Sequence, residues 1–250
     1  MSSYFSLASY YDLLTGDVDY GAFADYYEEM FKKYGGEVKT VLDLACGTGT
    51  LTCILAERGY EMIGIDASEE MLAVAADKAE GKSFAIEPMW LNQSVQELDL
   101  YGTVDAAVCS LDGINYVPED ELDTVFDRLR LFIRPGGLFI FDINTPQKLR
   151  GLDGQLFVDE DEDVLCLWRA EFDENENACY YGMDIFTSCG DGRNFWKRYF
   201  EEHIEYAHSI KMLVEKLKNA GFETAAVEGE FTRESPAEDE QRVFITAARA

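Results

Sequence analysis

The residues best placed to do chemistry are two carboxylates and two glycines around short apolar runs. Asp43 lies in the run VLDL at 41–44, which leads into the turn ACGTGT at 45–50. A second run, at 62–65, ends on Asp66. Glycines let a backbone approach a ligand closely, and an acid after the next strand can accept hydrogen bonds from two ribose hydroxyls. This layout predicts a site for a ligand that carries a nucleoside.

The details of the glycine turn narrow the class of ligand. A dinucleotide site has a third glycine at the position of Thr52. The acid Asp43 would also lie unfavourably close to a pyrophosphate. No Gly-Lys-Ser/Thr sequence follows, so a phosphate-binding P-loop is excluded. An acid at this position can instead help to hold an ammonium group. The turn therefore favours a ligand with ribose hydroxyls, an amino group and no phosphates, which describes S-adenosylmethionine. A Rossmann oxidoreductase is the weaker alternative.

Alternating strand and helix patterns must position these residues. Continuous apolar runs predict strands over 39–44, 61–66, 104–109 and 138–142. Helical spacing of apolar residues, with cap and turn residues at the ends, predicts helices over 19–34, 49–58, 68–79 and 119–132. This alternation predicts an α/β fold in which helices cover both faces of a mainly parallel sheet.

The alternation breaks after residue 150. Polar turns separate three longer strand patterns, over 164–172, 178–188 and 194–206, which predict an antiparallel insertion. A helix over 209–219 and strands over 222–228 and 242–248 close the chain. We therefore expect three parts: an N-terminal helical lid (1–35), a core (36–150 and 207–250) and an antiparallel β cap (151–206).

The composition indicates the class and compartment of the protein. With 250 residues, 47% of them hydrophobic, the chain can bury the core of one domain with an insertion. It contains no apolar run long enough for a membrane span and begins without a secretory signal pattern, so we expect a cytoplasmic protein. The six cysteines show neither a Cys-x-x-Cys pair nor metal-like histidine spacing. They are expected to be buried free thiols, with no metal site.

The charge is strongly negative. The chain has 21 basic and 49 acidic residues, a net charge of −28. Such a chain repels phosphate backbones, which disfavours a nucleic-acid partner. The negative field would attract a cationic or amine acceptor, although a solvated surface kept soluble by like charge is the more ordinary explanation.

Three motifs, in this order, carry a resemblance to a known family. They are VLDLACGTGT at 41–50, IGID at 63–66 followed by Ser68, Met71 and Leu72, and LFIRPGGLFI at 131–140. Over about residues 36–145 the chain resembles the class I S-adenosylmethionine-dependent methyltransferases. Tyr4, Ala8, Tyr11 and Asp12, with the EEH sequence at 201–203, are similar to a small-molecule, YqeM-like branch. The resemblance implies a Rossmann-like, seven-stranded mixed sheet in the order 3-2-1-4-5-7-6, with its seventh strand antiparallel.

The same resemblance implies which residues surround the cofactor. Its amino-acid end would lie among Asp43, Ala45, Cys46, Gly47 and Gly49, and Asp66 would accept hydrogen bonds from both ribose hydroxyls. Adenine would pack on Ala67 and Met71, near Ser94 and Val95, where many relatives carry an aspartate for the adenine amino group. The methyl-donor side would be lined by Leu111 and Cys109, although Cys109 is equally well explained as a small core residue. The product of the cofactor would be S-adenosylhomocysteine.

Other site candidates lie outside these motifs. Tyr11 and Tyr20 could cover the cofactor as a lid, with amphipathic helix packing as the alternative explanation. His203 could act as a general base toward an amine or a hydroxyl, or could be a hydrogen-bonded structural histidine. Three further residues follow the strand at 104–109, at the edge where open α/β sheets bind ligands, and are candidates to bind the acceptor: Asp112, Asn115 and Tyr116.

These observations predict an S-adenosylmethionine-dependent methyltransferase that transfers a methyl group to a small molecule by in-line displacement. Such a transfer needs alignment and exclusion of water more than a fixed catalytic residue. The tetrad Asn-Pro-Pro-Tyr, typical of amino methyltransferases that act on nucleic acids, is absent, since 111–114 read LDGI. A protein that binds the cofactor without transferring a methyl group is an alternative. We expect a monomer or homodimer with no nucleic-acid or membrane partner.

Overall fold

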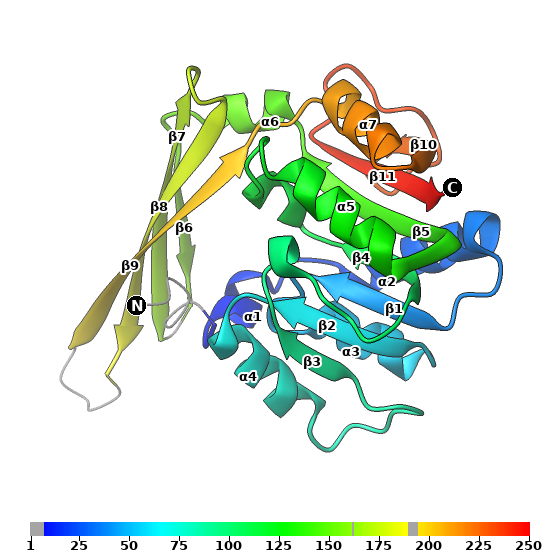
Figure 1. Ribbon diagram of the computed structural model, residues 1–250. Coiled ribbons are helices and arrows are strands. Elements are labelled where there is room, and N and C mark those ends of the chain that lie inside the picture. The colour runs from blue at the N-terminus through cyan, green and yellow to red at the C-terminus, as the bar shows by residue number, and fades with distance from the viewer. Residues whose placement is uncertain (1–7, 162, 190–194) are drawn as a thin grey trace.

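The computed structural model describes residues 8–161, 163–189 and 195–250, and these form two β-sheets with flanking helices (Figure 1). Seven strands form a core sheet in the order β10-β11-β5-β4-β1-β2-β3. Four others form a separate antiparallel sheet in the order β6-β7-β8-β9. The predicted α/β fold with an antiparallel insertion is confirmed.

The core sheet is parallel except at one edge. Its strands are β1 (Thr40–Leu44), β2 (Glu61–Asp66), β3 (Met89–Asn92), β4 (Val104–Cys109), β5 (Ile133–Asn144), β10 (Phe222–Gly229) and β11 (Arg242–Arg249). The first five are mutually parallel where they pair. β11 is antiparallel to both of its neighbours, β5 and β10. Counted within this sheet, the order is 3-2-1-4-5-7-6 with an antiparallel seventh strand, as the resemblance implied.

Helices cover both faces of the core sheet because the side chains along each strand point alternately to two apolar faces. On one face, α2 (Tyr20–Met30) and α3 (Thr50–Glu57) bury residues such as Tyr27 and Leu55 against Leu138 and Ile140 of β5. On the other, α5 (Leu122–Phe132) and α7 (Ile210–Asn219) bury Phe126 and Leu217 against Phe139 and Phe141. Successive residues of a strand point to opposite faces, so one strand serves both clusters.

The predicted helix starts depend on capping side chains. The Ser68 hydroxyl accepts a hydrogen bond from the Met71 N–H at the start of α4 (Glu69–Ala79). The Ser209 hydroxyl does the same for Met212 at the start of α7. Each cap satisfies one of the N–H groups that the first turn of a helix leaves without a partner.

The structure differs from the predicted elements at three places. Residues 134–137, which precede the strand predicted over 138–142, lie within β5 as a bulge, because Val104 pairs with Ile133 and Ala106 next pairs with Leu138. The sequence pattern missed several short elements, among them β3, α6 (Pro146–Gly151) and β6 (Leu156–Glu160). β9 begins at Trp196, and the predicted strand start at 194 lies outside the described residues.

The antiparallel sheet stands beside the core sheet (Figure 1). Its other strands are β7 (Val164–Asp173), β8 (Ala178–Ser188) and β9 (Trp196–Tyr206). Buried residues of its inner face, Val164, Cys166 and Ile185, pack in one cluster with Ala8 and with Met71 of α4. The short helix α1 (Tyr11–Leu14) contributes Tyr11 and Leu14 to the same cluster. No helix in the described part of the chain is long and apolar enough to cross a membrane.

Candidate functional site

One cavity of about 690 Å³ lies at the carboxyl ends of β1, β2 and β4. Its lining also includes residues of α1 and of the inner face of the antiparallel sheet, among them Trp168, Tyr181 and Met183. Parallel strands end at a common edge, so residues distant in sequence meet there. The volume lies within the range typical of small-molecule sites.

The turn between β1 and α3 requires glycine at two positions. Gly47 and Gly49 adopt left-handed backbone conformations, with φ of +54° and +69°. A Cβ added at Gly49 would come within 2.5 Å of the Trp90 ring and 2.9 Å of the Ala75 Cβ. Both the conformation and the crowding therefore exclude larger residues at Gly49. The sharp turn also directs the Gly47 N–H toward β2.

Asp66, at the end of β2, is held in place by backbone donors. Its carboxylate accepts hydrogen bonds of 2.8 Å from the Gly47 N–H and of 2.8 Å from the Ser68 N–H. Burial raises the pKa of Asp66, and these backbone hydrogen bonds oppose the rise. The carboxylate lines the cavity in a fixed orientation. Such an acceptor suits a pair of vicinal hydroxyls.

Asp43 is a carboxylate in an unfavourable environment. It is 2% exposed, and its Oδ2 accepts a hydrogen bond of 2.5 Å from the Thr52 hydroxyl. Burial is the main reason that its pKa rises to about 7, with a smaller contribution from the charge of Asp66. Thr52, at the position of the missing third glycine, thus supplies a hydroxyl to this acid. A cation in the cavity beside Asp43 would stabilise its ionised form.

Contacts from the N-terminal segment hold α1 against the glycine turn. The Asp12 carboxylate accepts hydrogen bonds from the Thr48 hydroxyl, at 2.5 Å, and from the Lys78 ammonium, at 2.8 Å. These contacts fasten α1 to the turn and to α4. Tyr11 and Tyr20, the predicted lid residues, both line the cavity.

Most of the predicted site residues meet in this cavity. Its lining includes Tyr11, Tyr20, Asp43, Ala45, Cys46, Gly47, Asp66, Ala67, Met71, Ser94, Val95, Leu111, Asp112, Tyr116 and His203. These residues come from α1 and α2, from the segments at the ends of β1, β2, β3 and β4, and from β9. The fold therefore brings them together. Whether each contacts a ligand stays a prediction at this point.

Three predicted residues do not line the cavity. Gly49 packs behind it, against Trp90. Cys109 is a fully buried core residue at the end of β4, and burial raises its pKa well above that of an ordinary thiol. Asn115 is also fully buried, and its amide bonds the backbone of Asn144 in both directions, at 3.0 and 3.1 Å. Asn115 therefore positions β5 from beneath the cavity.

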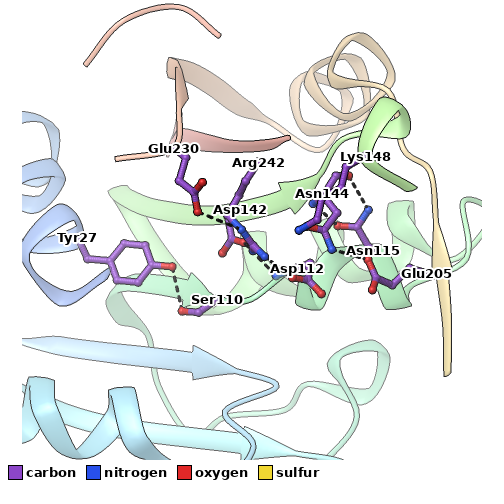
Figure 2. Close-up of polar contacts among 10 residues, drawn as sticks. All are labelled: Tyr27, Ser110, Asp112, Asn115, Asp142, Asn144, Lys148, Glu205, Glu230 and Arg242. Carbon is purple, nitrogen blue, oxygen red and sulfur yellow. Dashed lines mark hydrogen bonds and ion pairs between the residues drawn. The ribbon is translucent and has the colours of Figure 1, made fainter. Parts of the chain in front are cut away.

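A buried arginine joins three carboxylates beside the cavity (Figure 2). The Arg242 guanidinium donates to Asp112 at 2.9 Å and to Asp142, and lies 3.6 Å from the Glu230 carboxylate. Asp142 also accepts a hydrogen bond of 3.0 Å from the Asp112 N–H. This bond supports Leu111 and Asp112, which are both in left-handed backbone conformations (φ 53° and 56°). Strain of this kind in non-glycine residues is found mainly at functional sites.

A second polar group extends the cavity toward β9 (Figure 2). The Asn144 amide donates to the Glu205 carboxylate at 2.7 Å and accepts from the Lys148 ammonium at 2.7 Å. All three residues line the cavity, and the sequence analysis missed all three. Strand alternation could have placed Glu205 on the same face of β9 as His203. It could not have shown that this face is the buried one.

His203 and Tyr116, both predicted acceptor-site residues, lie together in the lining. Their rings meet edge-on with centroids 6.2 Å apart. The His203 Nε2 is 3.6 Å from a carboxylate oxygen of Glu201. A carboxylate near an imidazole can orient the ring. Among the described residues, no group of three or more His, Cys, Asp and Glu side chains is arranged to hold a metal ion.

The sheet order, the glycine turn and the acid after β2 define a Rossmann-like methyltransferase. Comparison with known proteins agrees. Residues 41–137 match the family model described as "Methyltransferase domain". The Bacillus subtilis (strain 168) protein named "Putative methyltransferase YqeM" is 30% identical over 250 residues, which cover 99% of this chain and 97% of that protein. A similarly named protein of Geobacillus sp. (strain WCH70) is 30% identical over 99% of this chain and 100% of its own length.

Solved structures have the same fold. The S-adenosylmethionine-dependent methyltransferase from Clostridium acetobutylicum ATCC 824 superposes with a TM-score of 0.86, at 28% identity, over 96% of both chains. The methyltransferase CalS10 from Micromonospora echinaspora, solved with S-adenosylmethionine bound, superposes with a TM-score of 0.72 at 19% identity, over 93% of this chain and 92% of that chain. The chain therefore belongs to the class I S-adenosylmethionine-dependent methyltransferases, with S-adenosylmethionine as its cofactor. The predicted family and cofactor are confirmed.

Proposed function

We propose that this enzyme transfers the methyl group of S-adenosylmethionine to a small molecule enclosed between the core sheet and the antiparallel sheet. The observation that carries this proposal is the continuity of the cavity. The same space of about 690 Å³ is lined by Asp66, at the end of β2, and by Glu205 and Arg242, which lie beside β5, and the sheet order places β1 and β4 between β2 and β5. Cofactor and acceptor would thus lie in one enclosed volume. Exclusion of water from that volume favours direct transfer.

The residues at the β1–β2 end fit the cofactor. The fixed Asp66 carboxylate would accept hydrogen bonds from the two ribose hydroxyls. Asp43 is buried and has no cationic hydrogen-bond partner among the described residues, and the amino group of the cofactor would supply one. When bound, the cofactor supplies an electrophilic methyl group on a sulfonium. Adenine would lie between residues that line this end of the cavity: Ala67, Met71, Ser94 and Val95.

Two flanking parts of the chain would close the site. Within the predicted lid (1–35), we assign the segment around α1 as the part that covers the site, because Asp12 holds α1 against Thr48 and Lys78 and Tyr11 lines the cavity. We assign residues 151–206 as a cap, because the inner face of their sheet supplies Trp168 to the lining. In this arrangement the lid covers the cofactor and the cap shapes the acceptor site.

A turnover assay tests the proposal. The protein is incubated with S-adenosylmethionine carrying a labelled methyl group and with extracts separated by ultrafiltration into small and large molecules. We expect label to enter the small-molecule fraction. Label found only in protein or nucleic acid would refute the small-molecule acceptor, and saturable cofactor binding with no transfer in any fraction would favour a binding protein. Family membership gives no support to the oxidoreductase alternative.

A further inference from the structure

We propose that Glu205 receives the amino group of the acceptor and takes its proton, so that the enzyme methylates a primary or secondary amine. This inference rests on the proposed function and names the class of substrate within the same cavity. Glu205 belongs to β9, far in sequence from the cofactor-binding motifs. Three observations carry it: the way the side chain is held, the charge around it and the chemistry of the transfer.

The Glu205 carboxyl group is fixed at the cavity wall. It is 5% exposed and lines the cavity. Its Oε2 accepts a hydrogen bond of 2.7 Å from the Asn144 amide, and the Tyr181 side chain also hydrogen-bonds the carboxyl group. A carboxylate offers about four lone-pair positions, so these two partners leave capacity for a ligand donor. Asn144 cannot turn freely, because its own amide oxygen binds Lys148.

The polar residues around Glu205 carry an excess of negative charge. Besides Glu205 itself, Figure 2 shows three carboxyl groups, those of Asp112, Asp142 and Glu230, and two cationic groups, those of Arg242 and Lys148. Arg242 is already engaged by three of these carboxylates. These carboxylates therefore neutralise the charge of Arg242, and the guanidinium is not available to bind an anionic ligand. The ligand that complements this end of the cavity is a cation.

The groups facing Glu205 from each neighbouring element tune its protonation. Burial and the charge of Asp112, after β4, raise the pKa of Glu205 to about 8. Asn144 on β5, Tyr181 on β8 and Lys148 on α6 act in the opposite direction. A carboxyl group with a pKa near neutrality is a better proton acceptor than an ordinary glutamate and can still ionise at physiological pH. It is suited to remove a proton from an ammonium group.

The proposed step is balanced in protons and electrons. An alkylammonium group donates one proton to the Glu205 carboxylate, which becomes a carboxylic acid, and the nitrogen regains its lone pair. The nitrogen–carbon bond then forms as the sulfur–carbon bond breaks, and the sulfur keeps the electron pair. The product is a methylated ammonium and S-adenosylhomocysteine. Glu205 returns its proton to solvent after the product leaves.

Ligand binding to the whole protein tests this inference without relying on activity. Matched pairs of probes share a carbon skeleton and differ in an amine or a hydroxyl: 2-aminoethanol and ethylene glycol, glycine and glycolate, glucosamine and glucose, within a larger library of such pairs. Binding is measured by ligand-observed NMR with S-adenosylhomocysteine present. We expect at least one amine to bind about tenfold or more tightly than its alcohol, as one charge-assisted contact allows. Absence of amine preference in every pair would overturn the proposal.

Variants identify Glu205 as the origin of that preference. Glu205→Gln should abolish it, while Glu202→Gln, the same change on the exposed outer face of the same strand, should leave it intact. In turnover, the wild-type kcat/KM should rise with pH through about 8, and Glu205→Asp should recover part of the activity lost in Glu205→Gln. An amine preference that survives Glu205→Gln would overturn the role of Glu205.

A control separates this inference from the function on which it rests. Glu205→Gln should bind S-adenosylhomocysteine within about twofold of wild type, because Glu205 lies at the other end of the cavity from Asp66. Transfer to a small alcohol would leave the proposed function standing and refute the role of Glu205. Transfer only to macromolecules would instead refute the proposed function.

Discussion

Replacing Asp43 by asparagine should make the ligand-free protein more stable at neutral and alkaline pH. The carboxylate is buried, and burial raises its pKa from 3.8 to about 7. The folded state therefore binds this proton more tightly than the unfolded state, so stability falls as pH rises between these values. An asparagine has no charge to bury, and its amide oxygen can still accept the hydrogen bond from Thr52.

The size of the effect follows from the two pKa values. The interval between 3.8 and about 7 corresponds to a cost of about 4 kcal/mol for the ionised form at alkaline pH. The sequence pI of 4.2 makes measurements near pH 4 impractical. Between about pH 5.5 and 8.5 the stability difference between Asp43→Asn and wild type should grow by roughly 2 kcal/mol and level off above about pH 7.

Urea unfolding without cofactor, at a series of pH values, measures this difference. Asp77→Asn, a change at an exposed acid on α4, is the control and should show no such trend. The affinity for S-adenosylhomocysteine should change in the opposite direction to stability. If Asp43 pairs with the amino group of the cofactor, Asp43→Asn should bind S-adenosylhomocysteine more weakly than wild type. A stability difference that stays constant from about pH 5.5 to 8.5 would refute the assignment of Asp43 as a buried acid that titrates near neutrality.

Three other substitutions test the site and its support. Asp66→Ala should weaken S-adenosylhomocysteine binding by about 1–3 kcal/mol in calorimetry, the usual loss for a hydrogen bond to a charged group; unchanged affinity would show that the ribose assignment is wrong. Gly49→Ala should reduce both stability and cofactor affinity, because its φ is +69° and the new Cβ would meet Trp90; a normal melting temperature would contradict the crowding argument. Arg242→Met should lower the free energy of unfolding by about 3–5 kcal/mol, since it leaves buried Asp112 and Asp142 without their cation; a loss below about 1 kcal/mol in urea unfolding would mean that the arginine is not structurally coupled to them.

The separation of the two ends of the cavity has a consequence for specificity. The cofactor end is built from backbone N–H groups and from motifs contiguous in sequence, around Gly47 and Asp66. The proposed acceptor end is built from single side chains on β5, β9 and β11, such as Asn144, Glu205 and Arg242. Substitutions at the acceptor end can therefore change the bound molecule without disturbing the cofactor contacts.

The sequence by itself determined the sheet, the glycine turn and the cofactor, and these predictions are confirmed by the strand order and by the family of the chain. Such features are local: β1, the turn and Asp66 occupy a short stretch whose residue types carry their own geometry. The positions of β6 and α6 were missed because short elements leave little periodic signal.

Only the tertiary structure decided which distant side chains meet in the cavity. Asn115 was predicted as a candidate to bind the acceptor, and the structure buries it and bonds its amide to the backbone of Asn144. Glu205 and Arg242 lie in ordinary strand patterns, and their partners are far away in the sequence. The contact of Glu205 with Asn144 joins the two sheets, and the contact of Arg242 with Asp112 joins β11 to the loop after β4. The burial and the charge environment of such side chains depend on residues that are distant in the sequence. A chain's local pattern therefore predicts the class of cofactor, whereas the packing of one sheet against another decides which distant side chains meet in the cavity.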